Sequence, residues 1–186
     1  KQSKNPIIIS GGGVFYSNAM EELSNFATKH NIPVTQTVMG YSTMKRDHSH
    51  YAGQIGGLGG KNTNDLAKET DLAIAVGTKL ADFTTGSWAN FENEKFKLVS
   101  INVSRFDANK HLAQAVVGDA KVSLIELSKA LGDWKVGDEW NEKSQRELKI
   151  WNEHIDKESA PTNQEVPSYI QVIGAIYRNS EPTDIA

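Results

Sequence analysis

The chain of 186 residues contains no cysteine. It therefore forms no disulfide, has no thiol nucleophile and offers no thiolate to a metal ion. A reducing compartment fits this composition, and we expect a cytoplasmic protein. No apolar run approaches the roughly 20 residues that a membrane-spanning helix requires, so we expect no membrane partner. The apolar residues 7–9 are also too few for the apolar region of a signal peptide.

An excess of one charge is missing as well. Twenty Lys and Arg residues stand against 23 Asp and Glu, which gives a formal net charge of -3. This balance provides no strong positive field for a phosphate backbone. We therefore expect no nucleic-acid partner.

Several catalytic motifs are also absent. The sequence has no G-x-S-x-G nucleophile elbow. Gly60-Lys61 is followed by Asn62, where a P-loop needs a hydroxyl residue for magnesium. His48 and His50 have no third ligand at a fixed spacing, so they predict no metal site. No nucleophile or acid–base pair stands out, and we predict no catalytic residue within the chain.

Short apolar runs alternate with helical patterns along the first two thirds of the sequence. Five runs are typical of strands buried on both faces, and residues 51–55 are a candidate sixth. The five are residues 6–10, 32–37, 71–77, 98–103 and 115–118. This alternation predicts an α/β fold, an open parallel sheet of five or six strands with helices on both faces.

The intervening segments carry helix signals. Asn18 followed by Glu21 predicts a capping box, and Asp119 and Ser168 are predicted to cap later helices. The composition becomes polar and helix-favouring after Gly132. We therefore predict a central α/β domain over residues 1–132 and a helical linker over 133–160. Because the first residue is not Met and the sequence stops where an apolar run starts, at 184–186, we expect a piece of a longer protein.

Gly11, Gly12 and Gly13 lie where the first strand ends and a helix follows. Backbone N–H groups at such a turn can hold an anion, and the first strand–helix turn is where open α/β sheets place ligands. The spacing is not G-x-G-x-x-G, so a tight turn for close strand–helix packing is the alternative. The loop is a candidate nucleotide or anion site.

A second candidate loop follows the strand over residues 71–77. Thr78 and Lys79 could bind an anion, and Asp82, Thr84 and Thr85 could contact substrate or a neighbouring domain, because ligand loops collect at the carboxyl ends of strands. Alternatively, the hydroxyls satisfy the backbone of the loop. The residues alone leave both interpretations open.

These motifs occur in a particular order. They are Gly11-Gly12-Gly13, Ile32-Pro33-Val34-Thr35, Gly40, Asp47-His48, Gly53-x-x-Gly56-x-x-Gly59, Asp71-Leu72-x-Ile74-x-Val76-Gly77-Thr78-Lys79 and Ile101-Asn102-Val103. Spread over about 130 residues, the length of a typical domain, the series resembles the central domain of thiamine-diphosphate-dependent enzymes. The threonine-rich segment 82–88 is most similar to the branch of trihydroxycyclohexanedione hydrolases of inositol breakdown. Lys79 stands where an arginine is usual, and lysine lacks the planar fork of arginine.

This resemblance implies a larger enzyme that hydrolytically opens a cyclic 1,2-diketone, with the thiazolium of the cofactor acting as carbanion and electron sink. Thiamine diphosphate and Mg²⁺ would be bound by missing N-terminal and C-terminal domains, because the chain has no Gly-Asp-Gly triplet. By the same resemblance, residues 161–186 would be the truncated start of the C-terminal domain that binds thiamine diphosphate. The chain would be a structural domain, inactive alone, within a homo-oligomer. Some family members hold FAD across this domain, so an FAD- or ADP-binding domain of an acetolactate-synthase-like enzyme is the alternative.

Overall fold

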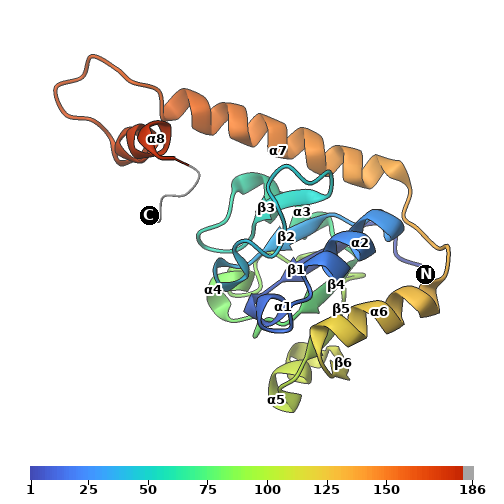
Figure 1. Cartoon of the computed structure of the whole chain (residues 1–186). Helices are drawn as coiled ribbons and strands as arrows, with labels where there is room; N and C mark the ends of the chain where they lie inside the picture. The colour runs from blue at the N-terminus through green and yellow to red at the C-terminus, as the bar shows by residue number, and fades with distance from the viewer. Residues whose placement is uncertain (182–186) are drawn as a thin grey trace. The chain divides into compact units, whose positions relative to one another are not determined.

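The computed structural model describes residues 1–181 and contains two compact units, residues 1–148 and 149–186. The first unit holds one sheet of six parallel strands in the order β3-β2-β1-β4-β5-β6 (Figure 1). The strands are β1 Pro6–Ser10, β2 Val34–Gln36, β3 Tyr51–Gln54, β4 Leu72–Val76, β5 Lys97–Asn102 and β6 Gln114–Val117. The predicted parallel α/β sheet is confirmed, including its sixth strand.

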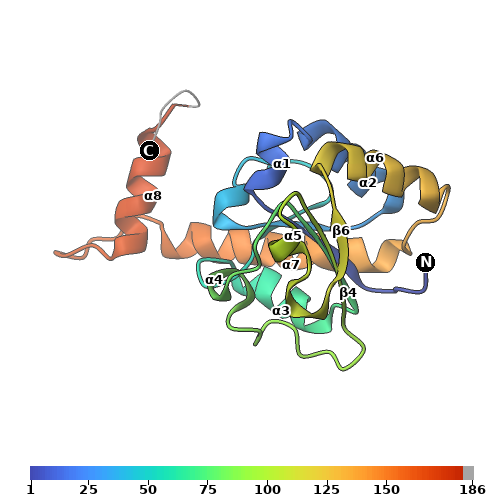
Figure 2. The same cartoon turned by 90° about the horizontal axis from the view of Figure 1, so that it is seen from below.

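Helices connect the strands and cover the sheet. In Figure 2, α1, α2 and α6 lie on one face and α3 on the other, as the crossovers of a parallel sheet require. The helices of the first unit are α1 Gly12–Tyr16, α2 Met20–His30, η1 Val38–Gly40, α3 Lys61–Glu69, α4 Asp82–Thr85, α5 Arg105–Ala108, η2 Lys110–Leu112 and α6 Ala120–Leu131. Helix α7, Asp138–Glu158, begins in this unit and ends in the second.

The core lies against the central strands. Ile7, Ile8 and Ile9 of β1 are completely buried, because successive side chains of a strand point to opposite faces and helices cover both. Burying each such side chain contributes about 1.5–3 kcal/mol. From α2, Leu23 and Phe26 add to the same core. The consecutive β-branched residues that predicted the first strand are therefore explained by burial on both faces.

One crossover covers the sheet with aromatic side chains. Between β4 and β5 the only helix is the four-residue α4. Trp88, Phe91 and Phe96 then pack in a row against the core, with ring centroids 5.5 Å apart for the first pair and 4.7 Å for the second. Their apolar area replaces that of a longer helix.

Two of the predicted helix caps are confirmed and one is wrong. The carboxylate of Asp119 accepts a hydrogen bond from the N–H of Val122 at 3.0 Å, as expected for an N-cap. Asn18 does not cap α2. It adopts a φ of 49° in the turn from α1 to α2, and Ala19 takes the N-cap position without a side-chain bond. An N-cap residue is typically in the extended region, and the left-handed backbone of Asn18 lies far from it.

The second unit contains the end of α7 and α8, Tyr169–Asn179. The predicted cap at Ser168 is confirmed, since Ser168 and Gln171 form a full capping box. Arg178 Nη1 donates to the carbonyl of Ser159 at 2.9 Å. The apolar run expected at 184–186 lies outside the described residues. Over residues 1–181, no helix has both the length and the apolar character needed to cross a bilayer.

Candidate functional site

The candidate residues gather at the carboxyl edge of the sheet. The chain leaves β1 toward β2 on one side, while β4 and the later strands extend on the other (Figure 1). Open α/β sheets bind ligands where the strand order reverses in this way. Gly11, Gly12 and Gly13 follow β1, and Thr78 and Lys79 follow β4, so the fold places both candidate loops at this point.

Backbone-to-backbone contact closes the gap between the two loops. The N–H of Gly11 donates to the carbonyl of Val76, and the N–H of Gly13 donates to the carbonyl of Gly77, both at 2.9 Å. A Cβ on Gly13 would lie 2.6 Å from the Cα of Gly77, which is far inside van der Waals contact. Two of the three N–H groups of the glycine loop are thus engaged within the chain. Anion binding by this loop stays a prediction.

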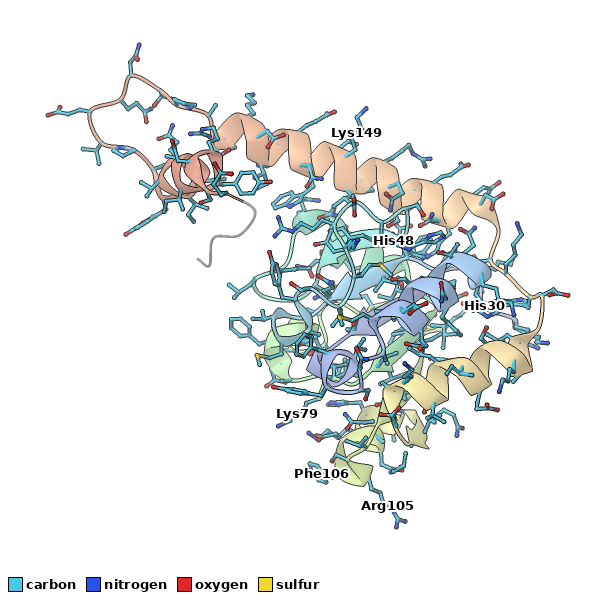
Figure 3. The ribbon with its side chains drawn as sticks, in the orientation of Figure 1. His30, His48, Lys79, Arg105, Phe106 and Lys149 are labelled. Carbon is cyan, nitrogen blue, oxygen red and sulfur yellow. The ribbon has the colours of Figure 1, made fainter. Side chains whose placement is uncertain are left out.

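The second candidate loop is also tied down. Thr78 is buried, and its hydroxyl accepts a hydrogen bond from the N–H of Leu80 at 3.4 Å. Its carbonyl accepts one from the side-chain amide of Asn102 at 3.1 Å. Lys79 is exposed near α5 (Figure 3). Its charge contributes, after the larger effect of the Lys110 hydrogen bond, to holding the pKa of Asp107 below its ordinary value.

The threonine-rich segment forms α4. Thr85 is fully buried; its hydroxyl donates to the carbonyl of Ala81 at 3.4 Å and accepts from the N–H of Trp88 at 3.3 Å. This hydroxyl therefore satisfies loop backbone. Asp82 is exposed and Thr84 half-buried, so these two remain open to solvent or to another domain.

Sequence reasoning missed how the loop after β3 is fixed. Gly56 has a φ of +101°, and its N–H and carbonyl both pair with the side-chain amide of Asn64, at 2.9 and 3.0 Å. The N–H of Gly57 donates to the carbonyl of Phe83 at 2.8 Å, which locks this loop onto α4. The Gly53-x-x-Gly56-x-x-Gly59 spacing signals tight turns, but their partners are distant in sequence.

A cavity of about 500 Å³ also lies at the carboxyl end of β5, lined by Arg105, Phe106, Asn109 and Lys110. Lys110 Nζ pairs with Asp107 at 2.8 Å and lies 4.7 Å from the ring centroid of Phe106. In Figure 3, Arg105 and Phe106 project away from the sheet. None of the sequence motifs above predicted this cavity.

His30 and His50 have structural roles. His30 is fully buried, and its ring nitrogens contact the carbonyl of Trp134 at 2.6 Å and the hydroxyl of Ser128 at 3.0 Å. His50 bonds the side-chain oxygen of Asn31 at 3.0 Å, and burial lowers its pKa below 6.5. These contacts occupy both rings with groups of the fold.

We assign no residue of 1–181 to thiamine diphosphate. Among residues 1–181, no three His, Asp or Glu side chains come together as a metal-binding group. The cofactor binds through its diphosphate and a magnesium ion, and Mg²⁺ requires oxygen ligands such as carboxylates in near-octahedral geometry. With Gly11 and Gly13 N–H also engaged, we derive no catalytic step from this part of the chain.

Comparisons with known proteins show which family this domain belongs to. Residues 1–127 match the sequence model of the thiamine pyrophosphate enzyme central domain. The 3D-(3,5/4)-trihydroxycyclohexane-1,2-dione hydrolase of Clostridium perfringens is 40% identical over 154 residues, which cover 83% of this chain and 24% of that protein. A hydrolase of the same name from Bacillus cereus, numbered 2, is 45% identical over 127 residues, 68% of this chain and 20% of that protein. The chain thus spans a quarter or less of these relatives' length, and it belongs to the family of thiamine pyrophosphate enzyme central domains.

Proposed function

We propose that this chain is the central scaffold domain of a longer thiamine-diphosphate-dependent hydrolase that opens trihydroxycyclohexane-1,2-dione. The observation that supports the reaction is the identity of 40–45% to hydrolases with that name, over 154 and 127 residues of this chain. The threonine-rich segment 82–88 lies within the matched domain, and we propose that Asp82 and Thr84 face a neighbouring domain.

The overall reaction can be written from the chemistry of the substrate. The bond between the two carbonyl carbons of the 1,2-diketone breaks. One of these carbons takes the hydroxyl of water and becomes a carboxylic acid, and the other takes the proton and becomes an aldehyde. Thiamine diphosphate supplies the electron sink that such a cleavage needs. We propose that the cofactor and its Mg²⁺ bind in domains outside residues 1–181.

We propose a structural role for the two candidate loops of the sheet. Gly11 and Gly13 allow β1 and β4 to approach closely at their carboxyl ends, and Thr78 joins β4 to β5 through Asn102. The binding of FAD or ADP is the less favoured alternative, because the N–H groups of Gly11 and Gly13 already donate within the chain. The enzyme is proposed to be a cytoplasmic homo-oligomer.

The test is a turnover assay on the full-length protein that carries this segment, loaded with thiamine diphosphate and Mg²⁺. With trihydroxycyclohexane-1,2-dione we expect one acid equivalent released per substrate consumed. With pyruvate, the substrate that an acetolactate synthase would use, we expect no consumption of substrate. Folding is checked by circular dichroism and cofactor loading by release on denaturation. A folded, loaded protein that ignores the dione would contradict the substrate assignment, and conversion of pyruvate would favour the synthase alternative.

A further inference from the structure

The carboxyl edge of the sheet carries exposed apolar side chains after five neighbouring strands. We call six of them the apolar rim, and each is more than half exposed: Phe15 at 56%, Tyr16 at 82%, Met39 at 76%, Leu58 at 63%, Phe83 at 60% and Phe106 at 75%. They follow β1, β2, β3, β4 and β5, and these strands are adjacent in the sheet.

Five of the six rim residues come from segments that contact each other, α1 with η1 and the loop of Leu58 with α4. The rings of Phe15 and Tyr16 are 6.0 Å apart, edge to face. A Cβ on Gly12 would lie 3.7 Å from both Met39 Cβ and the Tyr16 ring, which places α1 beside η1. Phe83 approaches the loop of Leu58 through the hydrogen bond from Gly57. The rim is therefore one edge of the fold rather than a set of scattered residues.

The opposite edge of the sheet is different. Among the five residues that precede each of the six strands, all of them described, Leu112 is the one large apolar residue with an exposed side chain. Isolated exposed apolar residues are ordinary on a protein surface, but their concentration on one edge marks an interaction surface.

We infer that the apolar rim is the surface on which the remainder of the same polypeptide docks. This inference rests on the proposed function, in which the chain is one domain of a longer enzyme. It is supported by the relatives' length, since the matched segment is 24% of the Clostridium perfringens hydrolase and most of that protein lies outside it. Interfaces between domains of one chain typically bury about 600–1,500 Å², an area that a rim spanning five strands can supply.

Because the chain has no cysteine, single cysteines report accessibility cleanly. Met39→Cys and Phe83→Cys are made in the 186-residue chain and in the full-length protein, with Leu112→Cys on the opposite edge as the control. Each is reacted with N-ethylmaleimide, and the modified residue is identified by peptide mass. We expect both rim cysteines to react at least tenfold more slowly in the full-length protein. The control should react equally in the two forms.

Equal reaction of the rim cysteines in both forms overturns the inference. Slow reaction in the 186-residue chain, together with a dimer in sedimentation, assigns the rim to a second copy and also overturns it. If a variant does not fold, the exposure of the rim is measured with an apolar dye instead. The 186-residue chain should enhance the fluorescence of anilinonaphthalene sulfonate, and M39S with F83S should reduce the enhancement. No enhancement by the parent chain contradicts an exposed rim.

The labelling result does not depend on turnover. A protected rim in a full-length protein that ignores the dione contradicts the substrate and leaves the docking surface intact. An active protein with a freely reactive rim contradicts the docking surface alone.

Discussion

Replacing Gly13 by alanine tests the close contact between β1 and β4. Gly13 lies in α1, where alanine is intrinsically favoured over glycine by up to about 1 kcal/mol. Helix propensity alone therefore predicts a more stable protein. The packing predicts the opposite, because the new Cβ would lie 2.6 Å from Gly77 Cα and 3.0 Å from Gly77 O.

The magnitude follows from these contacts. Carbon atoms pack best at about 3.5–4.0 Å, so the two loops would have to separate by roughly 1 Å. Overpacking of this kind costs about 1–3 kcal/mol. Weakening the hydrogen bond from Gly13 N to Gly77 O adds about 0.5–1.5 kcal/mol. Against the gain in propensity, we expect the free energy of unfolding to fall by about 1–3 kcal/mol.

The assay is urea unfolding at pH 7.5, followed by near-ultraviolet circular dichroism. Gly137→Ala is the matched control: a Cβ there meets nothing within 4 Å, so we expect its midpoint to change little. An unchanged or raised midpoint for Gly13→Ala would refute the idea that Gly13 is required for close packing. The loop would then be free for the ligand role that its sequence suggests.

Three further predictions follow from single contacts. Thr85→Val removes a buried hydroxyl bonded to Ala81 and Trp88 and should lower the free energy of unfolding by about 1–3 kcal/mol. Thr84→Val, at a half-buried position, should change that free energy little. Urea midpoints compare the two variants, and equal effects would contradict the assigned contacts. Trp140→Phe removes the hydrogen bond from Trp140 Nε1 to the carbonyl of Pro6 at 2.8 Å and should lower the free energy of unfolding by about 1–3 kcal/mol. Trp134→Phe should lower it less, because the indole of Trp134 bonds an exposed carbonyl. The reverse order in urea midpoints would argue against the Trp140 contact. Burial lowers the pKa of His50 below 6.5, so the unfolded chain binds a proton at His50 more readily than the folded chain does. The contribution of His50 to the free energy of unfolding is therefore fully present above pH 6.5 and declines as the pH falls below it. His50→Asn should shrink the difference in urea midpoint between pH 7.5 and 5.5, and an unchanged difference would assign the pH dependence to other groups.

The sheet was predictable because its determinants are local and repeated. Residues 7–9 and 73–76 are apolar in succession, and such short runs between turn signals are typical of strands covered on both faces. The start of α2 was not predictable from the Asn18–Glu21 spacing. The sequence does not show that α1 ends at Tyr16, which leaves Asn18 in a left-handed turn.

The candidate loops were placed correctly at the edge of the sheet, but their partners were not predictable. A glycine run has the same appearance whether its N–H groups face a ligand or a neighbouring strand. The choice depends on Gly77, 64 positions beyond Gly13, and this pairing exists only in three dimensions. Asn64 and Asn102 were missed for the same reason, since a side-chain amide gives no sequence signal of the backbone that it will bond.

We propose that this chain is a scaffold whose carboxyl-edge loops close on each other rather than on a cofactor. Isothermal titration calorimetry of the 186-residue chain with FAD, with ADP and with thiamine diphosphate plus Mg²⁺ tests it most directly. We predict no saturable heat with any of the three up to millimolar concentration, in a sample whose folding is verified by circular dichroism. Binding of FAD or ADP in the micromolar range would contradict the claim and identify the domain as a nucleotide-binding one.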